Sequence, residues 1–307
     1  MLCLGTKGEE FFLKYSIDKI KLEFQYIKLD RVQSFLNKLS GTDYNDYYES
    51  NKVTKCKHNF RYATDEGSVY VGVIPNWKNE SRYDKSIVLE YNPNKVNPFL
   101  SDVFSWLKRV PRACIKVMSF DIAVDMYIPY ESVRMLKRDK RESFAIFGHS
   151  DVETRYLGAM GHNHIKLYNK GLEQKLNVDW TRFEITVKEI NSFSCTLKEF
   201  ETSIKIPTLY HVCSQIGFDE YEQLNDTTRI ILESIIDDIN VLYTIKKYDT
   251  RKKYEKMLGQ FLNPIDISVK NMYKCFIDYF DSLFNIDLVD SDIVEVGVLL
   301  NKLSIIW

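Results

Sequence analysis

Two segments near the middle of the chain alternate polar and apolar residues with a period of two, which restricts them to half-buried β-strands. The polar positions are His164, Lys166, Tyr168 and Lys170 in the first segment and Arg182, Glu184, Thr186 and Lys188 in the second. Successive side chains of a strand point to opposite faces, so the intervening apolar residues face the other way. Residues 120–125 repeat the pattern, with Asp121 and Asp125 on the polar side. The sequence therefore predicts a sheet with one apolar face and one charged face.

The rest of the N-terminal two thirds adds further strands and some helices. Alternation or short apolar runs predict strands at 20–26, 60–73 (a hairpin), 87–91, 119–127, 153–170 (a second hairpin) and 181–188, and helices at 31–39, 98–109 and 130–141. These elements make an α+β fold, in which an antiparallel or mixed β-sheet carries helices on its apolar face.

After Pro207 the pattern changes from period two to helical spacing. Ile231, Ile235, Ile239 and Leu242 recur on one helix face, and further helix is predicted at 251–261 and 268–285. We therefore expect an α+β domain over 1–207 and a mainly helical C-terminal domain over 208–307. The isoleucine stripe is either core packing or the seam of a homodimer.

The bulk composition narrows the class of protein. The six cysteines are scattered without CxxC pairs, which argues against a zinc ribbon or a disulfide framework and for a reducing cytoplasm. The chain has no run of about 18 apolar residues that would span a membrane. The apolar run at its N-terminus is too short for that of a signal peptide. We expect a cytoplasmic protein with no membrane partner.

A basic segment at 246–256 places six bases in eleven residues, among them Lys246, Lys247, Arg251, Lys252 and Lys253. One interpretation is a solvated helix end, because lysines favour helix C-termini. The other is an element that contacts the phosphates of duplex DNA. The net charge of −1 gives no global preference for nucleic acid.

Four short motifs occur in a fixed order along the strands. They are Asp121-Ile122-Ala123-Val124-Asp125, Tyr156-Leu157-Gly158, Ile165-Lys166-Leu167-Tyr168-Asn169-Lys170 and Arg182-Phe183-Glu184. In order and spacing they resemble the replication-initiation proteins of rolling-circle plasmids, whose relatives include conjugative-element relaxases and filamentous-phage initiators. The resemblance covers about residues 17–190.

The resemblance implies a chemistry and its residues. In that family a tyrosine attacks a DNA phosphodiester, and a divalent metal polarises the phosphate. Asp121, Asp125 and Glu184 would then hold Mg²⁺ or Mn²⁺, since hard cations prefer carboxylate oxygens. Arg182 would clamp a phosphate, and Lys166 and Lys170 would neutralise developing charge. The expected partner is the DNA of a plasmid or element origin.

The position of the nucleophile departs from the family pattern. Relatives place the tyrosine about ten residues beyond the Arg-x-Glu glutamate, where this chain has Phe193 as its nearest aromatic residue. Tyr210 is the first tyrosine downstream and is the predicted nucleophile, with Tyr127 and Tyr168 as alternatives.

These observations leave four hypotheses. The chain is a replication initiator that nicks and rejoins DNA, a DNA-binding protein on the same scaffold that has lost its nucleophile, or a conjugative relaxase. The fourth is a nucleotide- or phosphate-binding enzyme with no role on DNA. The sequence lacks the P-loop and Rossmann glycine patterns that would favour the fourth.

Overall fold

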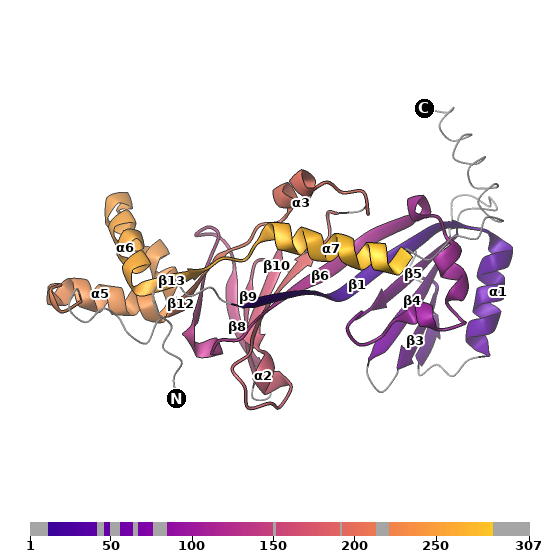
Figure 1. Cartoon of the computed structure of the whole chain (residues 1–307), viewed down its shortest axis with the longest axis horizontal. Helices are drawn as coiled ribbons and strands as arrows, with labels where there is room; N and C mark the ends of the chain where they lie inside the picture. Colours follow the sequence, from indigo (N-terminus) through magenta and orange to yellow (C-terminus); the bar gives the residue numbers. More distant parts are fainter. Residues whose placement is uncertain are drawn as a thin grey trace. The chain divides into compact units, whose positions relative to one another are not determined.

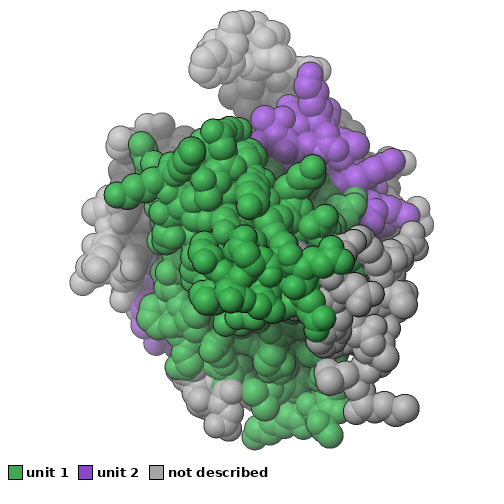
Figure 2. Space-filling view, turned by 90° about the vertical axis from the view of Figure 1, so that its left-hand side faces the viewer, with its two compact units in different colours: residues 1–15, 123–186, 204–269 green, residues 16–122, 187–203, 270–307 purple. Residues whose placement is uncertain are grey.

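The computed structural model describes residues 12–41, 46–49, 56–63, 67–75, 85–149, 152–190, 192–212 and 221–284. The chain divides into two compact units (Figure 2). Unit 1 comprises residues 1–15, 123–186 and 204–269, and unit 2 comprises residues 16–122, 187–203 and 270–307. The domain boundary predicted after residue 207 stays a prediction.

Within the described ranges, ten strands form one large sheet, in the order β2-β3-β4-β5-β1-β6-β11-β10-β9-β8 (Figure 1). The strands are β1 (Leu13–Ile27), β2 (Asp46–Glu49), β3 (His58–Ala63), β4 (Ser68–Pro75), β5 (Lys85–Tyr91), β6 (Ile115–Met126), β8 (Phe144–His149), β9 (Val152–Leu157), β10 (His164–Asn169) and β11 (Thr181–Val187). The sheet is antiparallel, as in the pairing of β10 with β11. Its strands include every strand segment that the alternation predicted, and the α+β fold class is confirmed.

Unit 2 buries the apolar side of its strands under helices. On β1, Ile20, Leu22 and Phe24 are fully buried, as a period of two requires. Helix α1 (Leu29–Ser40) contributes Phe35, whose ring lies 5.1 Å from that of Trp106. Helix α3 (Leu197–Ser203) and helix α7 (Val269–Phe284) add Phe200 and Phe276, which are also fully buried.

The single helix predicted at 98–109 is wrong. The chain forms two short 3₁₀ helices there, η1 (Pro98–Leu100) and η2 (Ser105–Arg109), and a third, η3 (Arg112–Cys114), follows. The side chain of Asn97 accepts a hydrogen bond from the Phe99 amide and so fixes the start of η1, whereas Ser101 is extended. The break lets the apolar residues on both sides of it enter the core, since Phe99, Phe104 and Leu107 are all buried.

Unit 1 contains a second, three-stranded sheet in the order β13-β12-β7. Its strands are β7 (Val133–Leu136), β12 (Thr208–Val212) and β13 (Leu262–Ile265). The helix predicted at 130–141 is therefore wrong: a single 3₁₀ turn, η4 (Tyr130–Ser132), leads into β7. The reason is tertiary, because Val133 and Met135 are buried on one face and pair with His211 and Leu209 of β12.

The C-terminal part of unit 1 is mainly helical, as predicted. It contains α5 (Asp226–Asp237), η5 (Ile239–Thr244) and α6 (Tyr248–Phe261). Of the predicted stripe, Ile235, Ile239 and Leu242 are buried in one cluster and Ile231 packs against it. The stripe is thus core packing. No helix in the described part of the chain is both long and apolar enough to cross a lipid bilayer.

Candidate functional site

The strands that carry the four motifs are consecutive neighbours in the large sheet, in the order β6-β11-β10-β9. On β10 and β11, Lys166 lies directly opposite Glu184 and Tyr168 lies directly opposite Arg182. Opposite residues of an antiparallel pair share a face, so these four polar side chains lie together. The prediction that these extended segments lie side by side is confirmed.

The glycine of the Tyr-x-Gly motif has a structural role in the turn that leads from β9 to β10. Gly158 has φ of +82°, a conformation that L side chains rarely adopt, and an added Cβ would lie 2.9 Å from Nη2 of Arg138. A side chain at this position would therefore displace the chain just before β10. The glycine helps to set where the polar residues of β10 begin.

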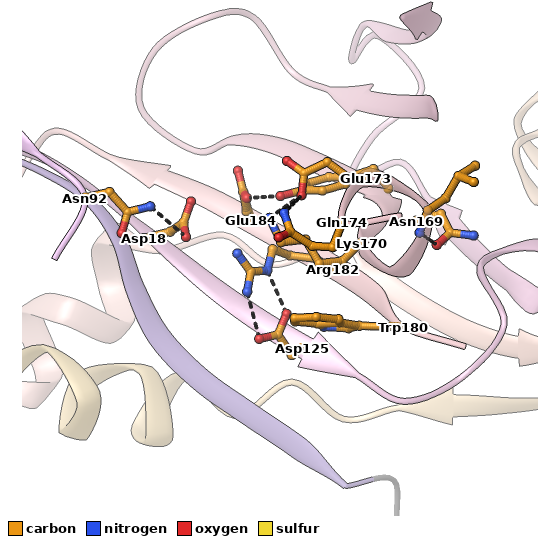
Figure 3. Close-up of polar contacts among 12 residues, drawn as sticks. Asp18, Asn92, Asp125, Asn169, Lys170, Glu173, Gln174, Trp180, Arg182 and Glu184 are labelled. Atoms are coloured by element: carbon orange, nitrogen blue, oxygen red, sulfur yellow. Dashed lines mark hydrogen bonds and ion pairs between the residues drawn. The ribbon is translucent and has the colours of Figure 1, made fainter. Parts of the chain in front are cut away.

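The predicted phosphate clamp, Arg182, holds a carboxylate of its own chain (Figure 3). Its Nε and Nη2 donate to Oδ1 and Oδ2 of Asp125 at 2.7 and 2.9 Å, and the indole of Trp180 donates to Oδ1 at 2.8 Å. Arg182 and Asp125 are only 6% and 3% exposed. A bidentate pair removed from water in this way fixes both side chains and the strands that carry them.

Glu184 is the centre of a second set of contacts on the same face. One carboxylate oxygen accepts a hydrogen bond from the Tyr168 hydroxyl at 2.6 Å, and the other accepts one from Nζ of Lys166 at 3.0 Å. Burial, followed by the negative charge of Glu184, raises the pKa of Tyr168 far above its ordinary value. The Tyr168 hydroxyl therefore acts as a donor, and its environment opposes formation of a phenolate.

Lys170 begins the short helix α2 (Lys170–Glu173) and is buried there. Its ammonium pairs with Glu173 and lies 5.7 Å from the centre of the Tyr168 ring. The backbone amides of Lys170 and Gly171 both donate to the carbonyl of Trp180, which ties α2 to the start of β11. Burial raises the pKa of Glu173, but hydrogen bonds from Lys170 and Gln174 outweigh it and leave that pKa below its ordinary value.

We call these two neighbouring sets of residues together the polar network: Asp125, Lys166, Tyr168, Lys170, Glu173, Trp180, Arg182 and Glu184. Sequence analysis identified most of them and missed Trp180 and Glu173. A signal for Trp180 was present, since residues 180, 182 and 184 share one face of a strand. Glu173 carries no such signal, because its contact depends on the turn of α2.

The predicted metal ligands do not fit a bound cation as arranged. No group of three or more His, Cys, Asp or Glu side chains suited to a metal occurs among the residues that the structure describes. Both oxygens of Asp125 and both of Glu184 accept hydrogen bonds from the polar network. Asp121 lies on the part of β6 that belongs to unit 2 and is 8% exposed. The metal site stays a prediction, and we assign no chemical step to it.

The three candidate tyrosines differ in position and environment. Tyr210 lies on β12, where it packs against the helical cluster of unit 1, and burial raises its pKa. Tyr168 is buried in the polar network. Tyr127 directly follows β6, is 52% exposed, and stacks on Trp180 with a centroid distance of 6.2 Å.

The predicted DNA-contacting bases lie at the beginning of α6, where Lys246 and Lys247 precede the helix and Arg251, Lys252 and Lys253 occupy its first turns. Positive charge is unfavourable at this end of a helix dipole, so the helix-terminus interpretation does not explain them. All but Arg251 are exposed, and the guanidinium of Arg251 lies 5.6 Å from the ring centre of the exposed Tyr248. Among the residues that the structure describes, Arg251 and Lys252 each form an ion pair with Glu255.

The chain is similar to a solved structure. No protein-family model and no curated protein matches the sequence. The rolling circle replication initiator protein from Geobacillus stearothermophilus matches over 91% of this chain and 100% of its own, with 14% sequence identity and a TM-score of 0.34. This similarity is too weak to assign a fold family or a function to the chain.

Proposed function

We propose that this chain initiates replication of a plasmid or mobile element by binding its origin and cutting and rejoining one DNA strand through a tyrosine. The observation that carries the proposal is the polar network itself. Four motifs that resemble those of rolling-circle initiators lie on consecutive strands, and acids and bases from three of these strands form two neighbouring sets of contacts. Burial of charged side chains costs free energy, and packing of the strands alone does not require such charges on this face.

The reaction requires an attacking hydroxyl that DNA can reach. The tyrosine oxygen loses its proton, forms a bond to phosphorus, and releases the 3′ oxygen as a hydroxyl, which leaves the 5′ phosphate on the protein. Tyr127 suits this role best, because it is exposed and stacks on Trp180, which donates to Asp125. Burial raises the pKa of both Tyr168 and Tyr210 and so disfavours them as nucleophiles.

The cations of the polar network divide into two groups by exposure. The side chain of Lys166 is 32% exposed, whereas those of Lys170 and Arg182 are 10% and 8% exposed. Lys166 is therefore the residue that would meet a phosphate oxygen, and Arg182 and Lys170 would position their neighbours. The exposed bases that begin α6 would contact the backbone of duplex DNA and orient the protein on it.

A nicking assay on supercoiled DNA that carries the element's own origin tests the proposal. We expect an open-circular product, and parallel reactions with Mg²⁺, Mn²⁺ or EDTA test separately whether a divalent metal is needed. The Glu184→Gln variant, which loses the charge that holds Lys166 and Tyr168 in place, should cleave about 10²-fold more slowly through misplacement of these groups, with origin affinity unchanged. Glu201→Gln, at an exposed position of α3, is the matched control. Equal loss of cleavage and affinity in Glu184→Gln would assign Glu184 a structural role.

A second candidate function is origin binding without cleavage. It is favoured by Phe193, which occupies the region where relatives carry their nucleophile and packs its ring 4.5 Å from that of Phe280 in unit 2. Phenylalanine has no hydroxyl to attack phosphorus. This function predicts tight, specific binding of the origin together with intact supercoiled DNA at every metal concentration.

A further inference from the structure

A cavity of about 290 Å³ lies in unit 1 and is lined by none of the residues of the polar network. Arg155 of β9 lines it and pairs with Leu167 of β10, so its side chain is on the face of β10 opposite to Lys166 and Tyr168. The other lining residues used here are Arg134, Glu131, Asp237, Glu153 and Asn169. No function proposed above uses this cavity.

The two arginines are held by backbone carbonyls, which leaves part of each guanidinium available. Arg155 donates from Nη1 to the carbonyl of Val133 at 2.7 Å. Arg134 donates from Nε to the carbonyl of Ile236 at 2.7 Å and from Nη1 to the carbonyls of Glu131 and Val133. Among the described residues, the Nη2 group of each has no hydrogen-bond partner. Burial, and then the positive charge of Arg155, holds the pKa of Arg134 below its ordinary value. A ligand that accepts hydrogen bonds would relieve this repulsion.

A flat surface is also built into the cavity. The guanidinium of Arg155 lies 4.3 Å from the ring centre of Tyr130, and Glu153 holds both residues, accepting from the Tyr130 hydroxyl at 2.8 Å and from Nε of Arg155 at 3.3 Å. These contacts fix the plane of the guanidinium. Unpaired nucleobases commonly stack on such planes.

The acids around the cavity exclude a simple anion as its ligand. The lining contains three carboxylates, from Glu131, Glu153 and Asp237, and only the two guanidiniums to balance their charge. In the described part of the chain the carboxylates of Glu131 and Asp237 accept no hydrogen bond. The amide of Asn169 uses its oxygen to cap α2, and its nitrogen is left as a donor. The ligand must therefore present donors as well as acceptors on one planar body.

We propose that this cavity binds a guanine base. Guanine has two adjacent acceptors, O6 and N7, that can accept from the Nη2 groups of the two arginines, and two adjacent donors, N1–H and the 2-amino group, that match one carboxylate. Adenine, cytosine and thymine lack that donor pair. The base could belong to a free nucleotide or to an unpaired segment of DNA, and in the second case the inference rests on the proposed function.

Single-stranded oligonucleotides test the proposal with the full-length protein. Fluorescence anisotropy would compare an all-thymine strand with strands that carry one central guanine, inosine, adenine or cytosine. We expect guanine to bind about 5- to 150-fold more tightly than the other natural bases, the range of one good bidentate contact. Inosine, which lacks the 2-amino group, should lose part of this preference.

Variants of the lining residues should remove the preference for guanine. In Arg155→Gln and in Asp237→Asn the ratio of affinities for guanine and thymine strands should fall towards one, and in the exposed-surface control Arg141→Gln it should stay unchanged. Asp237→Asn keeps the test decisive if Arg155→Gln fails to fold. A ratio that both variants leave intact would overturn the proposal.

Calorimetry with guanosine monophosphate distinguishes the two sources of the base. Saturable binding that competes with the guanine strand supports a free nucleotide, and a strand preference without such binding supports DNA. The absence of any guanine preference in both arms overturns the inference. That result would leave origin nicking untouched, and loss of nicking with the preference retained would reject only the proposed function.

Discussion

Removal of either partner of the buried Asp125–Arg182 pair should strongly destabilise the protein. The side chains are 4% and 8% exposed, and two hydrogen bonds join them at 2.7 and 2.9 Å. With charge centres about 4 Å apart, their attraction is about 4 kcal/mol at an effective dielectric constant of 20. Asp125→Ala leaves the guanidinium buried and uncompensated, so we expect a loss of about 3–5 kcal/mol.

A double-mutant cycle measured by urea unfolding isolates the pair. Asp125→Ala and Arg182→Ala should each cost about 3–5 kcal/mol, and the double variant should cost clearly less than their sum because neither charge is left alone. The exposed pair Arg112–Asp281, with side chains 45% and 50% exposed, is the control. Its disruption should cost at most about 1 kcal/mol. Additive losses, or single losses as small as the control, would refute the reasoning.

Three further predictions concern the polar network and α6. Tyr168→Phe removes the buried hydrogen bond to Glu184 and should lower the free energy of unfolding by about 1–3 kcal/mol in urea unfolding; no change would mean that water replaces the hydroxyl. The pKa of Glu173 in the folded protein lies below its unfolded value of 4.5. The stability that ionised Glu173 contributes is therefore present above pH 4.5 and is lost as the pH falls through the folded-state pKa. Wild-type protein should therefore lose more stability below pH 4.5 than Glu173→Gln, and parallel pH profiles would contradict this. Charge reversal of the bases in the first turns of α6, which are Arg251, Lys252 and Lys253, should weaken binding of duplex DNA and flatten the dependence of the affinity on salt concentration. An unchanged salt dependence would exclude these bases from the interface.

The sequence predicted most of the large sheet because its strands have a strict period of two. β10 and β11 are the clearest cases, since Ile165, Leu167, Phe183 and Ile185 alternate with polar residues along them. β7 and β12 were not predicted. They are four and five residues long, and each is defined by pairing with a strand more than 70 residues away, which no local pattern encodes.

The candidate site was predictable as a set of residues but not as a set of contacts. Alternation placed Lys166 and Glu184 on one face, and the structure pairs them. The partner of Arg182 depends on how β11 packs beside β6, which the sequence leaves open, so a predicted phosphate clamp proved to hold Asp125. The cavity at Arg155 draws on segments from residues 130 to 237 and could not have been found from any one of them.

The most direct test of strand transfer is a peptide map of the protein after reaction with a radiolabelled origin strand. The proposed function predicts a covalent adduct between the 5′ phosphate and the peptide that contains Tyr127, lost in Tyr127→Phe and retained in Tyr210→Phe. An adduct at Tyr210 would instead identify Tyr210, on β12 of the three-stranded sheet, as the nucleophile. Origin binding without an adduct at any tyrosine would contradict strand transfer by this protein.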